Sequence, residues 1–196
     1  MGKYYSVFQK SIMAGIFIGL GCIAYLSCDN KVVGAFLFSI GLLSVLECQA
    51  LLFTGAICRS AKADTLTVIY IGNFVGIALM AALARFSGIV EIVDMSARVS
   101  RPFYQIWLRG IICEICIYIA VITYDRFQHP LFVVLPVMAF ILCGSEHCIA
   151  DMFYLLLSSG SNVRTIFFIP FVTLGNVIGA LLMRCVAHQK TEDLEF

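Results

Sequence analysis

Ionisable side chains lie in the middle of long apolar segments of this sequence. The deepest of them are Glu47, Glu114, Glu146, His147 and Asp151. A charged group at the centre of a membrane-spanning helix costs about 2.5–3.5 kcal/mol on insertion scales, so such residues are functional candidates. Imidazole changes its charge near neutral pH, and the neutral ring can still donate a hydrogen bond to an anion or lend it a proton. His147 is therefore the leading candidate, and a histidine that only joins two helices is the alternative.

The carboxylates of the same segments restrict which solutes could pass. Three ionised carboxylates beside one pathway would repel an anion, so we expect at least some of them to be protonated or paired. Glu146 adjoins His147 in the sequence, but neighbours on a regular helix do not face each other. We therefore expect Glu146 to tie a helix break to another segment.

These polar residues need a membrane protein to position them. The chain has 196 residues, of which 61% are hydrophobic and 13% charged, and its mean hydropathy is +0.98. A soluble domain carries about 25% charged residues, whereas one membrane-spanning helix needs about 20 apolar residues. The length therefore predicts about six spans in a single domain, 1–196, that ends in a charged tail from Lys190 to Glu195. The expected spans are 11–27, 32–58, 66–84, 105–124, 131–157 and 165–187.

Polar residues interrupt two of these stretches. The stretch 32–58 is interrupted at 47–49, and the stretch 131–157 is interrupted at 144–147. Broken helices at matching positions of two halves are the best sequence indication of a transport site. Non-helical backbone at membrane depth is tolerated only where it is buried in protein or lines a cavity. We therefore expect both breaks, with Thr54 just after the first, to face a narrow apolar pathway.

A repeated motif supports this division into halves. Gly72-Asn73-Phe74-Val75-Gly76 falls in the third span, and Gly175-Asn176-Val177-Ile178-Gly179 falls in the sixth. Three spans per half is an odd number, so the second half must enter the membrane from the opposite side, which predicts an inverted repeat. Close helix packing explains the glycines. Asn73 and Asn176 need polar partners as well, because an amide in lipid must be hydrogen bonded.

Composition argues against several other classes of protein. The net charge of +1 and the isoelectric point of about 7.5 give no indication of nucleic-acid binding. Cys113 and Cys116 form a C-x-x-C pair inside an apolar helix, where packing is the simpler interpretation. A haem or metal enzyme would need clustered ligands, whereas His129 and His188 fall in loop or tail positions. We therefore expect no cofactor and no enzymatic activity.

The distribution of basic residues gives only a slight preference for one orientation. If both termini are cytoplasmic, the inside residues are Lys3, Lys10, Arg59, Lys62, Arg126, Arg184 and Lys190. The outside residues are then Lys31, Arg85, Arg98, Arg101, Arg109 and Arg164. We expect cytoplasmic termini from this small excess.

At these residues the sequence resembles the formate/nitrite transporter family. The motifs that carry the resemblance occur in the family's order over about residues 10–188. They are Leu52-Phe53-Thr54-Gly55, Gly72-Asn73-Phe74-Val75-Gly76, Arg109-Gly110-Ile111-Ile112-Cys113, Glu146-His147-Cys148-Ile149-Ala150 and Gly175-Asn176-Val177-Ile178-Gly179. The resemblance implies an all-α membrane fold of six helices in two inverted three-helix repeats, aquaporin-like, with the second and fifth helices broken. It also implies a homopentamer in the cell membrane that carries formate, nitrite, hydrosulfide or lactate.

The resemblance also implies roles for particular residues. His147 matches the central pore histidine, Thr54 its hydrogen-bond partner, and Arg98 the position of a cation in the outer vestibule. Asn73 and Asn176 match the family's helix-three and helix-six motifs. The expected apolar constrictions, which would strip water from the solute, are Phe38, Leu42, Leu52, Phe53 and Phe140.

Three departures from the family pattern affect the expected function. Glu114 and Asp151 stand where the family has asparagine, and only about ten residues precede the first span. A carboxylate in the pore opposes an anion, so a pore for a neutral small solute or a small cation is the alternative function. We hypothesise that Glu114 is protonated or paired, and that permeation changes when it ionises. The short amino-terminal segment predicts weaker gating by that segment.

Overall fold

The computed structural model describes residues 2–159 and 163–187, and within these ranges the regular structure is α-helical apart from one isolated bridge, Val93 to Ser158. Four helices of 25 residues dominate: α1 (Gly2–Leu26), α4 (Ala63–Ser87), α6 (Phe103–Phe127) and α9 (Val163–Ala187). Each is about 37 Å long at 1.5 Å per residue, and each contains a segment long and apolar enough to cross a membrane. The charged tail, Lys190 to Glu195, and His188 lie outside the described residues.

Both stretches that we expected to be interrupted consist of two helices joined by non-helical residues. The first is α2 (Lys31–Glu47) followed by α3 (Phe53–Cys58), and the second is α7 (Leu131–Leu142) followed by α8 (Cys148–Leu156). The backbone turns left-handed just after the first helix of each stretch, at Gln49 (φ 51°) and Gly144 (φ 66°). A left-handed residue ends an α-helix because the intrahelical hydrogen bonds cannot continue through it.

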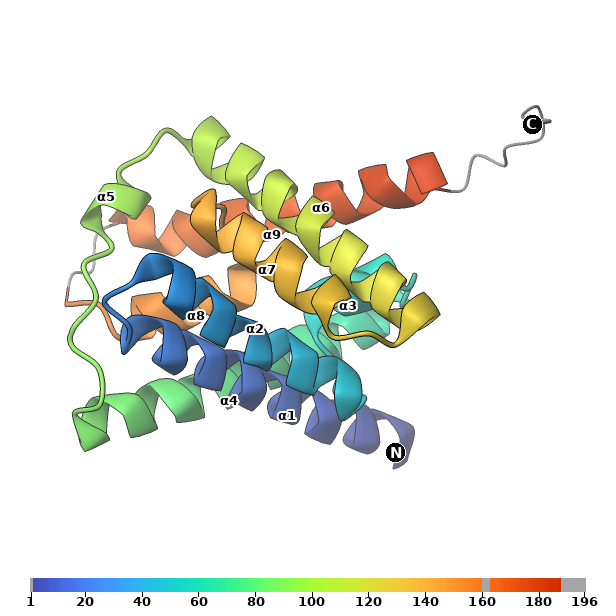
Figure 1. Ribbon diagram of the computed structural model, residues 1–196, viewed down its shortest axis with the longest axis horizontal. Helices are drawn as coiled ribbons and strands as arrows, with labels where there is room; N and C mark the ends of the chain where they lie inside the picture. Colours follow the sequence, from blue (N-terminus) through green and yellow to red (C-terminus); the bar gives the residue numbers. More distant parts are fainter. Residues whose placement is uncertain (1, 160–162, 188–196) are drawn as a thin grey trace.

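The long helices form two pairs that hold the broken helices between them (Figure 1). α1 packs on α4 and α6 packs on α9, and glycine brings the backbones into direct contact in both pairs. A methyl group added at Gly76 would lie 2.1 Å from the Ile12 carbonyl oxygen, and one at Gly175 would lie 2.2 Å from that of Trp107. Only glycine permits this approach, so the glycines of the repeated motif set the helix spacing.

The remaining connection between the two pairs passes over one end of the molecule. It contains the short helix α5 (Ser96–Val99), between α4 and α6 (Figure 1). This connection carries Arg98 and Arg101 to the end of α8.

Apolar side chains lie outside and polar ones inside, as is usual for a protein in lipid. Phe86 is 88% exposed and Ile166 is 71% exposed. The buried polar side chains gather between the helices instead: Ser11, Ser39, Thr54, Asn73, Glu114, Ser145, Glu146, His147, Asp151 and Asn176. Most other buried side chains are apolar, so these few buried polar groups are the ones whose partners need to be identified.

Candidate functional site

The two breaks meet at a contact between His147 and Thr54. His147 precedes α8, and its Nδ1 accepts a hydrogen bond from the Ala150 backbone N–H at 3.2 Å. Its Nε2 lies 3.1 Å from the hydroxyl oxygen of Thr54, which belongs to α3. Because Nδ1 accepts, the neutral ring carries its proton on Nε2 and donates it to Thr54. His147 therefore presents an N–H donor toward the other broken stretch, and both side chains are buried.

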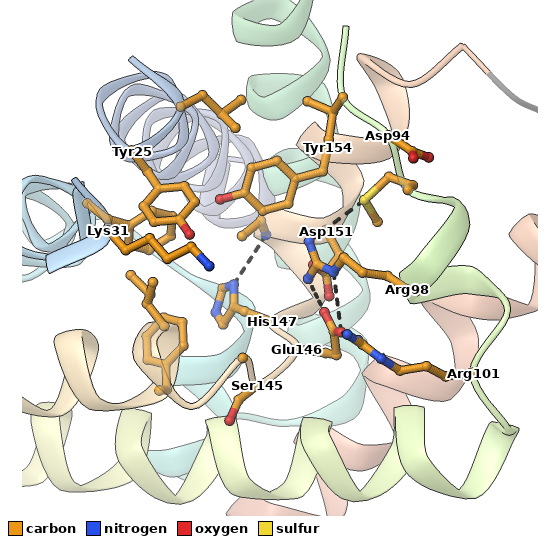
Figure 2. Close-up of a pocket in the computed structure, with 18 residues that line it drawn as sticks. Tyr25, Lys31, Asp94, Arg98, Arg101, Ser145, Glu146, His147, Asp151 and Tyr154 are labelled. Atoms are coloured by element: carbon orange, nitrogen blue, oxygen red, sulfur yellow. Dashed lines mark hydrogen bonds and ion pairs between the residues drawn. The ribbon is translucent and has the colours of Figure 1, made fainter. Parts of the chain in front are cut away.

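A cavity of about 380 Å³ leads to His147 from the end of the molecule that carries α5 (Figure 2). Phe38 of α2 and Phe140 of α7 both line it. The Phe140 ring stacks on His147 with 6.1 Å between ring centroids, and Phe38 meets Phe140 edge-on at 6.0 Å. The approach to the histidine is therefore walled by aromatic rings.

A second cavity, also of about 380 Å³, lies at the opposite end of α4. It is lined by Phe53, by Tyr70 and by residues at the start of α4, whereas the His147 cavity includes Val93, beyond the end of α4. His147 lines the first cavity, and Phe53, which directly precedes Thr54, lines the second, so the two partners of the contact adjoin different cavities.

The remaining expected constriction residues are packed inside the protein. Leu42 and Leu52 are each 2% exposed and line neither cavity. The five residues expected to form apolar constrictions therefore divide into two that line the His147 cavity, one that lines the second cavity and two that are buried.

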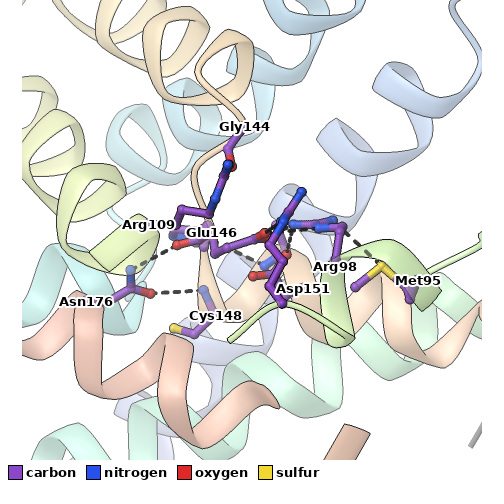
Figure 3. Close-up of polar contacts among 11 residues, drawn as sticks. Met95, Arg98, Arg109, Gly144, Glu146, Cys148, Asp151 and Asn176 are labelled. Atoms are coloured by element: carbon purple, nitrogen blue, oxygen red, sulfur yellow. Dashed lines mark hydrogen bonds and ion pairs between the residues drawn. The ribbon is translucent and has the colours of Figure 1, made fainter. Parts of the chain in front are cut away.

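Two arginines neutralise two buried carboxylates beside the His147 cavity (Figure 2 and Figure 3). Glu146 accepts hydrogen bonds from the Arg98 guanidinium and, at 2.6 Å, from Arg101. Arg98 also donates to Asp151 at 2.5 Å. The Glu146 and Asp151 side chains are 0% and 1% exposed, whereas the arginines reach in from the α4–α6 connection. The charge of Arg98 is thus used in an ion pair rather than presented alone in the vestibule.

Asn73 and Asn176 hold the two breaks by the same set of hydrogen bonds. Asn73 accepts from the Phe53 N–H at 2.8 Å and donates to the carbonyls of Ser11 and Leu51, both at 2.8 Å. Asn176 accepts from the first N–H of α8, that of Cys148, at 2.9 Å. It donates to the carbonyls of Gly110 at 2.8 Å and Glu146 at 3.1 Å. Each amide thus satisfies two backbone groups at its break, which have no intrahelical partner, and ties them to a carbonyl of a long helix, α1 for Asn73 and α6 for Asn176.

Replacing Asn176 with leucine is expected to lower the free energy of unfolding by about 2 kcal/mol, because the buried Cys148 N–H and Glu146 carbonyl lose their partner and the bond to the Gly110 carbonyl is lost as well. The measurement is chemical or thermal unfolding of the full chain in detergent. Asn30→Leu is the matched control, since Asn30 caps α2 at an exposed position where water replaces the lost bond, and it should cost about 0.5–1 kcal/mol. Equal losses for the two variants would contradict this account.

Glu114 lies behind α3 rather than in either of these two cavities. It is 0% exposed, and its Oε1 accepts a hydrogen bond from the Cys58 thiol at 3.3 Å. Its Oε2 has no hydrogen-bond partner among the described residues. A methyl group at Gly179 of α9 would lie 2.7 Å from the Glu114 Cβ, so the stem of the side chain packs on α9 while its carboxyl group meets α3.

Two basic residues of the site were not singled out from the sequence. Arg101 follows Arg98 by three residues in the α4–α6 connection, and both arginines donate to Glu146. This short spacing between two basic residues was the signal in the sequence that could have indicated a shared partner. Lys31 lines the His147 cavity from the first residue of α2. In the sequence it belongs only to a short polar turn.

Glu47, one of the polar residues that interrupt the first stretch, accepts a hydrogen bond from the Tyr124 hydroxyl.

Comparison with known proteins agrees with the family resemblance of the sequence motifs. The family model described as "Formate/nitrite transporter" matches residues 2–189. The "Formate channel FocA" of Haemophilus influenzae is 26% identical over 181 residues, which cover 74% of this chain and 64% of that protein. The chain thus spans less than two thirds of the length of this relative.

Solved structures with a similar fold include two channels. A protein described as "FNT family ion channel" superimposes with a TM-score of 0.83 at 23% identity, and the match covers 95% of this chain and 90% of that one. A "Pentameric formate channel with formate bound" also gives a TM-score of 0.83, at 22% identity, and here the match covers 94% of this chain and 96% of that one.

Proposed function

Because this chain belongs to the formate/nitrite transporter family, we propose that it is a membrane channel or transporter for small monovalent anions or their conjugate acids. The chain is a multi-pass membrane protein, with four helices long and apolar enough to span the bilayer among its described residues. The observation that carries the proposal is the contact of His147 with Thr54, whose two partners adjoin different cavities. A buried N–H donor beside the aromatic rings of Phe140 and Phe38 is suited to a small anion or weak acid.

We propose the same architecture that we expected from the sequence: six membrane-crossing units in two inverted repeats, aquaporin-like, with both termini cytoplasmic. The equivalent bonds of Asn73 and Asn176 support the repeat, because they join corresponding elements of the two halves. A homopentamer is proposed because one structural relative is described as pentameric. The slight excess of basic residues supports the orientation.

In the proposed mechanism, Phe38 and Phe140 remove water from the solute before it reaches His147. The solute then replaces Thr54 as the acceptor of the Nε2 proton, which stabilises negative charge in apolar surroundings. If His147 first takes up a second proton from water, the resulting imidazolium can give one proton to the anion, which leaves as a neutral acid while the ring returns to its neutral form. Leu42, one helical turn after Phe38 in α2, adds to this first constriction. Leu52 and Phe53 form the second apolar constriction, where a neutral acid crosses more easily than an anion.

Uptake by proteoliposomes tests the proposal. Initial rates for formate, nitrite, hydrosulfide and lactate are measured across pH, with ammonium as the cation and empty vesicles as the background. We expect saturable uptake of at least one of the weak acids and none of ammonium. Ammonium uptake in the absence of weak-acid uptake would establish the alternative, a pore for a neutral solute or small cation.

The arrangement of charges favours the anion over the cation. Asp151, one of the two extra carboxylates that suggested a cation pore, is neutralised by Arg98, and the neighbouring Glu146 is neutralised by Arg98 and Arg101. Glu114 lines neither cavity of the proposed pathway. Relatives described as channels also favour transport over a membrane enzyme.

Glu114 gives a separate prediction about pH dependence. A lone carboxylate buried at this depth is costly to ionise, so we propose that the group is uncharged at neutral pH and that its ionisation hinders transport. Glu114→Gln should therefore keep the uptake rate within about twofold at neutral pH, because glutamine has the shape of the neutral acid. The variant should also lose the decline in uptake rate at alkaline pH that ionisation of Glu114 produces in the wild type. An unchanged pH profile from acid to alkaline pH would reject a role for Glu114 ionisation.

A further inference from the structure

Lys31 occupies a position in the His147 cavity that its place in the fold does not require. It is the first residue of α2, it is exposed, and it lines the cavity. Figure 2 shows its side chain extending across the mouth of the cavity toward the side on which His147 lies. Tyr25 stands on the same rim, so a hydroxyl group accompanies the ammonium group there.

The other charges around the cavity are compensated. Arg98 and Arg101 are bound to Glu146 and Asp151, so these four groups contribute little net field. Asp94 also lines the cavity, but in Figure 2 it lies on the side opposite Lys31 with its carboxylate turned away from His147. The backbone N–H of Ser96 donates to Asp94 at 2.8 Å and lowers the pKa of that carboxyl group. Of the two charges that lack an ion-pair partner among the described residues, the one on the His147 side of the cavity is thus the positive charge of Lys31.

Neither an ion pair nor helix stability accounts for Lys31. Within residues 2–159 and 163–187 it forms no ion pair. The first turn of α2 contains no acidic residue that would offset its charge. A cation at a helix amino terminus opposes the helix dipole and costs about 0.3–1 kcal/mol. The charge of the lysine therefore does not stabilise α2.

We propose that Lys31, rather than Arg98, is the cation that draws the transported anion into the cavity and toward His147. This inference rests on the proposed function and adds a specificity-determining residue to it. A charge of one sign at the mouth of a low-dielectric cleft raises the local concentration of the opposite ion and the rate of its entry. Because the ammonium group is exposed, salt screens its effect over about 10 Å at 0.1 M ionic strength.

Formate uptake at low and high salt tests this role. At about 10 mM ionic strength, Lys31→Gln should lower the initial rate at subsaturating formate by about fivefold, and Lys31→Glu should lower it further. At about 0.5 M of an impermeant salt the difference between wild type and Lys31→Gln should shrink to less than about twofold. Lys31→Arg keeps the charge and should transport like the wild type.

Arg85→Gln is the matched control, because it removes one positive charge from an exposed residue near the same end that does not line the His147 cavity. Its uptake rate should stay within about twofold of the wild type at either salt concentration. An equal loss in Arg85→Gln would show a general surface-charge effect and overturn the inference. A Lys31→Gln rate equal to the wild-type rate at low salt would overturn it too.

A binding measurement separates this inference from the proposed function. Saturation-transfer NMR with formate is applied to the full chain in detergent, without a transport step. A formate signal in the wild type that is lost in Lys31→Gln supports the inference, even if the wild type transports no anion and the proposed function fails. Equal formate signals in the two proteins would overturn the inference, even if the wild type transports formate.

Discussion

Replacing His147 with leucine is expected to lower the initial rate of formate uptake by about 100-fold, the effect of removing one hydrogen-bond donor from a buried anion site. The physical reason is that Nε2–H is the donor at the contact whose two partners adjoin different cavities. Leucine fills the space but offers nothing to replace the water that the anion loses. The measurement is formate uptake by proteoliposomes, with the amount of folded protein matched between variants.

His147→Asn separates hydrogen bonding from proton transfer. His147 also caps α8 through Nδ1, and asparagine is an equally good cap, so the local fold should persist. Its amide can donate a hydrogen bond but cannot release a proton near neutral pH. We expect uptake at neutral pH within about tenfold of the wild type, while the increase in uptake on acidification is lost.

The two histidine variants can each contradict part of the mechanism. Wild-type uptake by His147→Leu would show that the solute does not pass His147. A normal increase on acidification in His147→Asn would leave the pathway in place and reject the proton relay. A Thr54→Val variant should resemble neither, because the solute itself replaces Thr54 as the acceptor, and its uptake should stay within about tenfold of the wild type.

The sequence predicted those parts of the fold that depend on local chemistry. Polar residues at 47–49 and 144–147 cannot remain in a lipid-facing helix without cost, and the helices end at Glu47 and Leu142. The all-helical fold and the family resemblance are confirmed. The amides of Asn73 and Asn176 needed partners in any membrane fold.

The partners of the ionisable residues could not be predicted from the sequence. Arg101 and Glu146 are separated by 45 positions, and their contact depends on how the α4–α6 connection folds over α8. The sequence also did not show which neighbouring helices the Glu114 side of α6 faces. In a membrane helix both the lipid-facing and the protein-facing sides are apolar, so the periodicity that marks the inner face of a soluble helix is lost.

The ion pairs at α8 explain how the chain retains a carboxylate at Asp151, where the resemblance led us to expect asparagine. Arg98 bridges Glu146 and Asp151, and its guanidinium lies 5.2 Å from the centre of the Tyr154 ring. A planar guanidinium can hold two carboxylates at once, which a lysine ammonium does less well. The aspartate and the arginine therefore belong together as one compensated substitution.

Arg98→Gln should accordingly lower the free energy of unfolding by about 3–5 kcal/mol, the cost of leaving a buried charge without its partner. Asp151 would lose its cation, whereas Glu146 would keep Arg101. Adding Asp151→Asn to Arg98→Gln removes the orphaned charge and should recover at least half of the loss. The measurement is unfolding of the four members of this double-mutant cycle in detergent.

An exposed ion pair provides the control for this cycle. Arg59 and Asp125 also form a close pair, at 2.6 Å, but their side chains are 40% and 41% exposed. Arg59→Gln should cost no more than about 1 kcal/mol, because water solvates the remaining carboxylate. If Arg98→Gln costs as little as Arg59→Gln, or if Asp151→Asn fails to rescue it, the carboxylates do not depend on Arg98. The break before α8, and with it His147, would then be held by the Asn176 hydrogen bonds together with the contacts of Arg101 and Arg109.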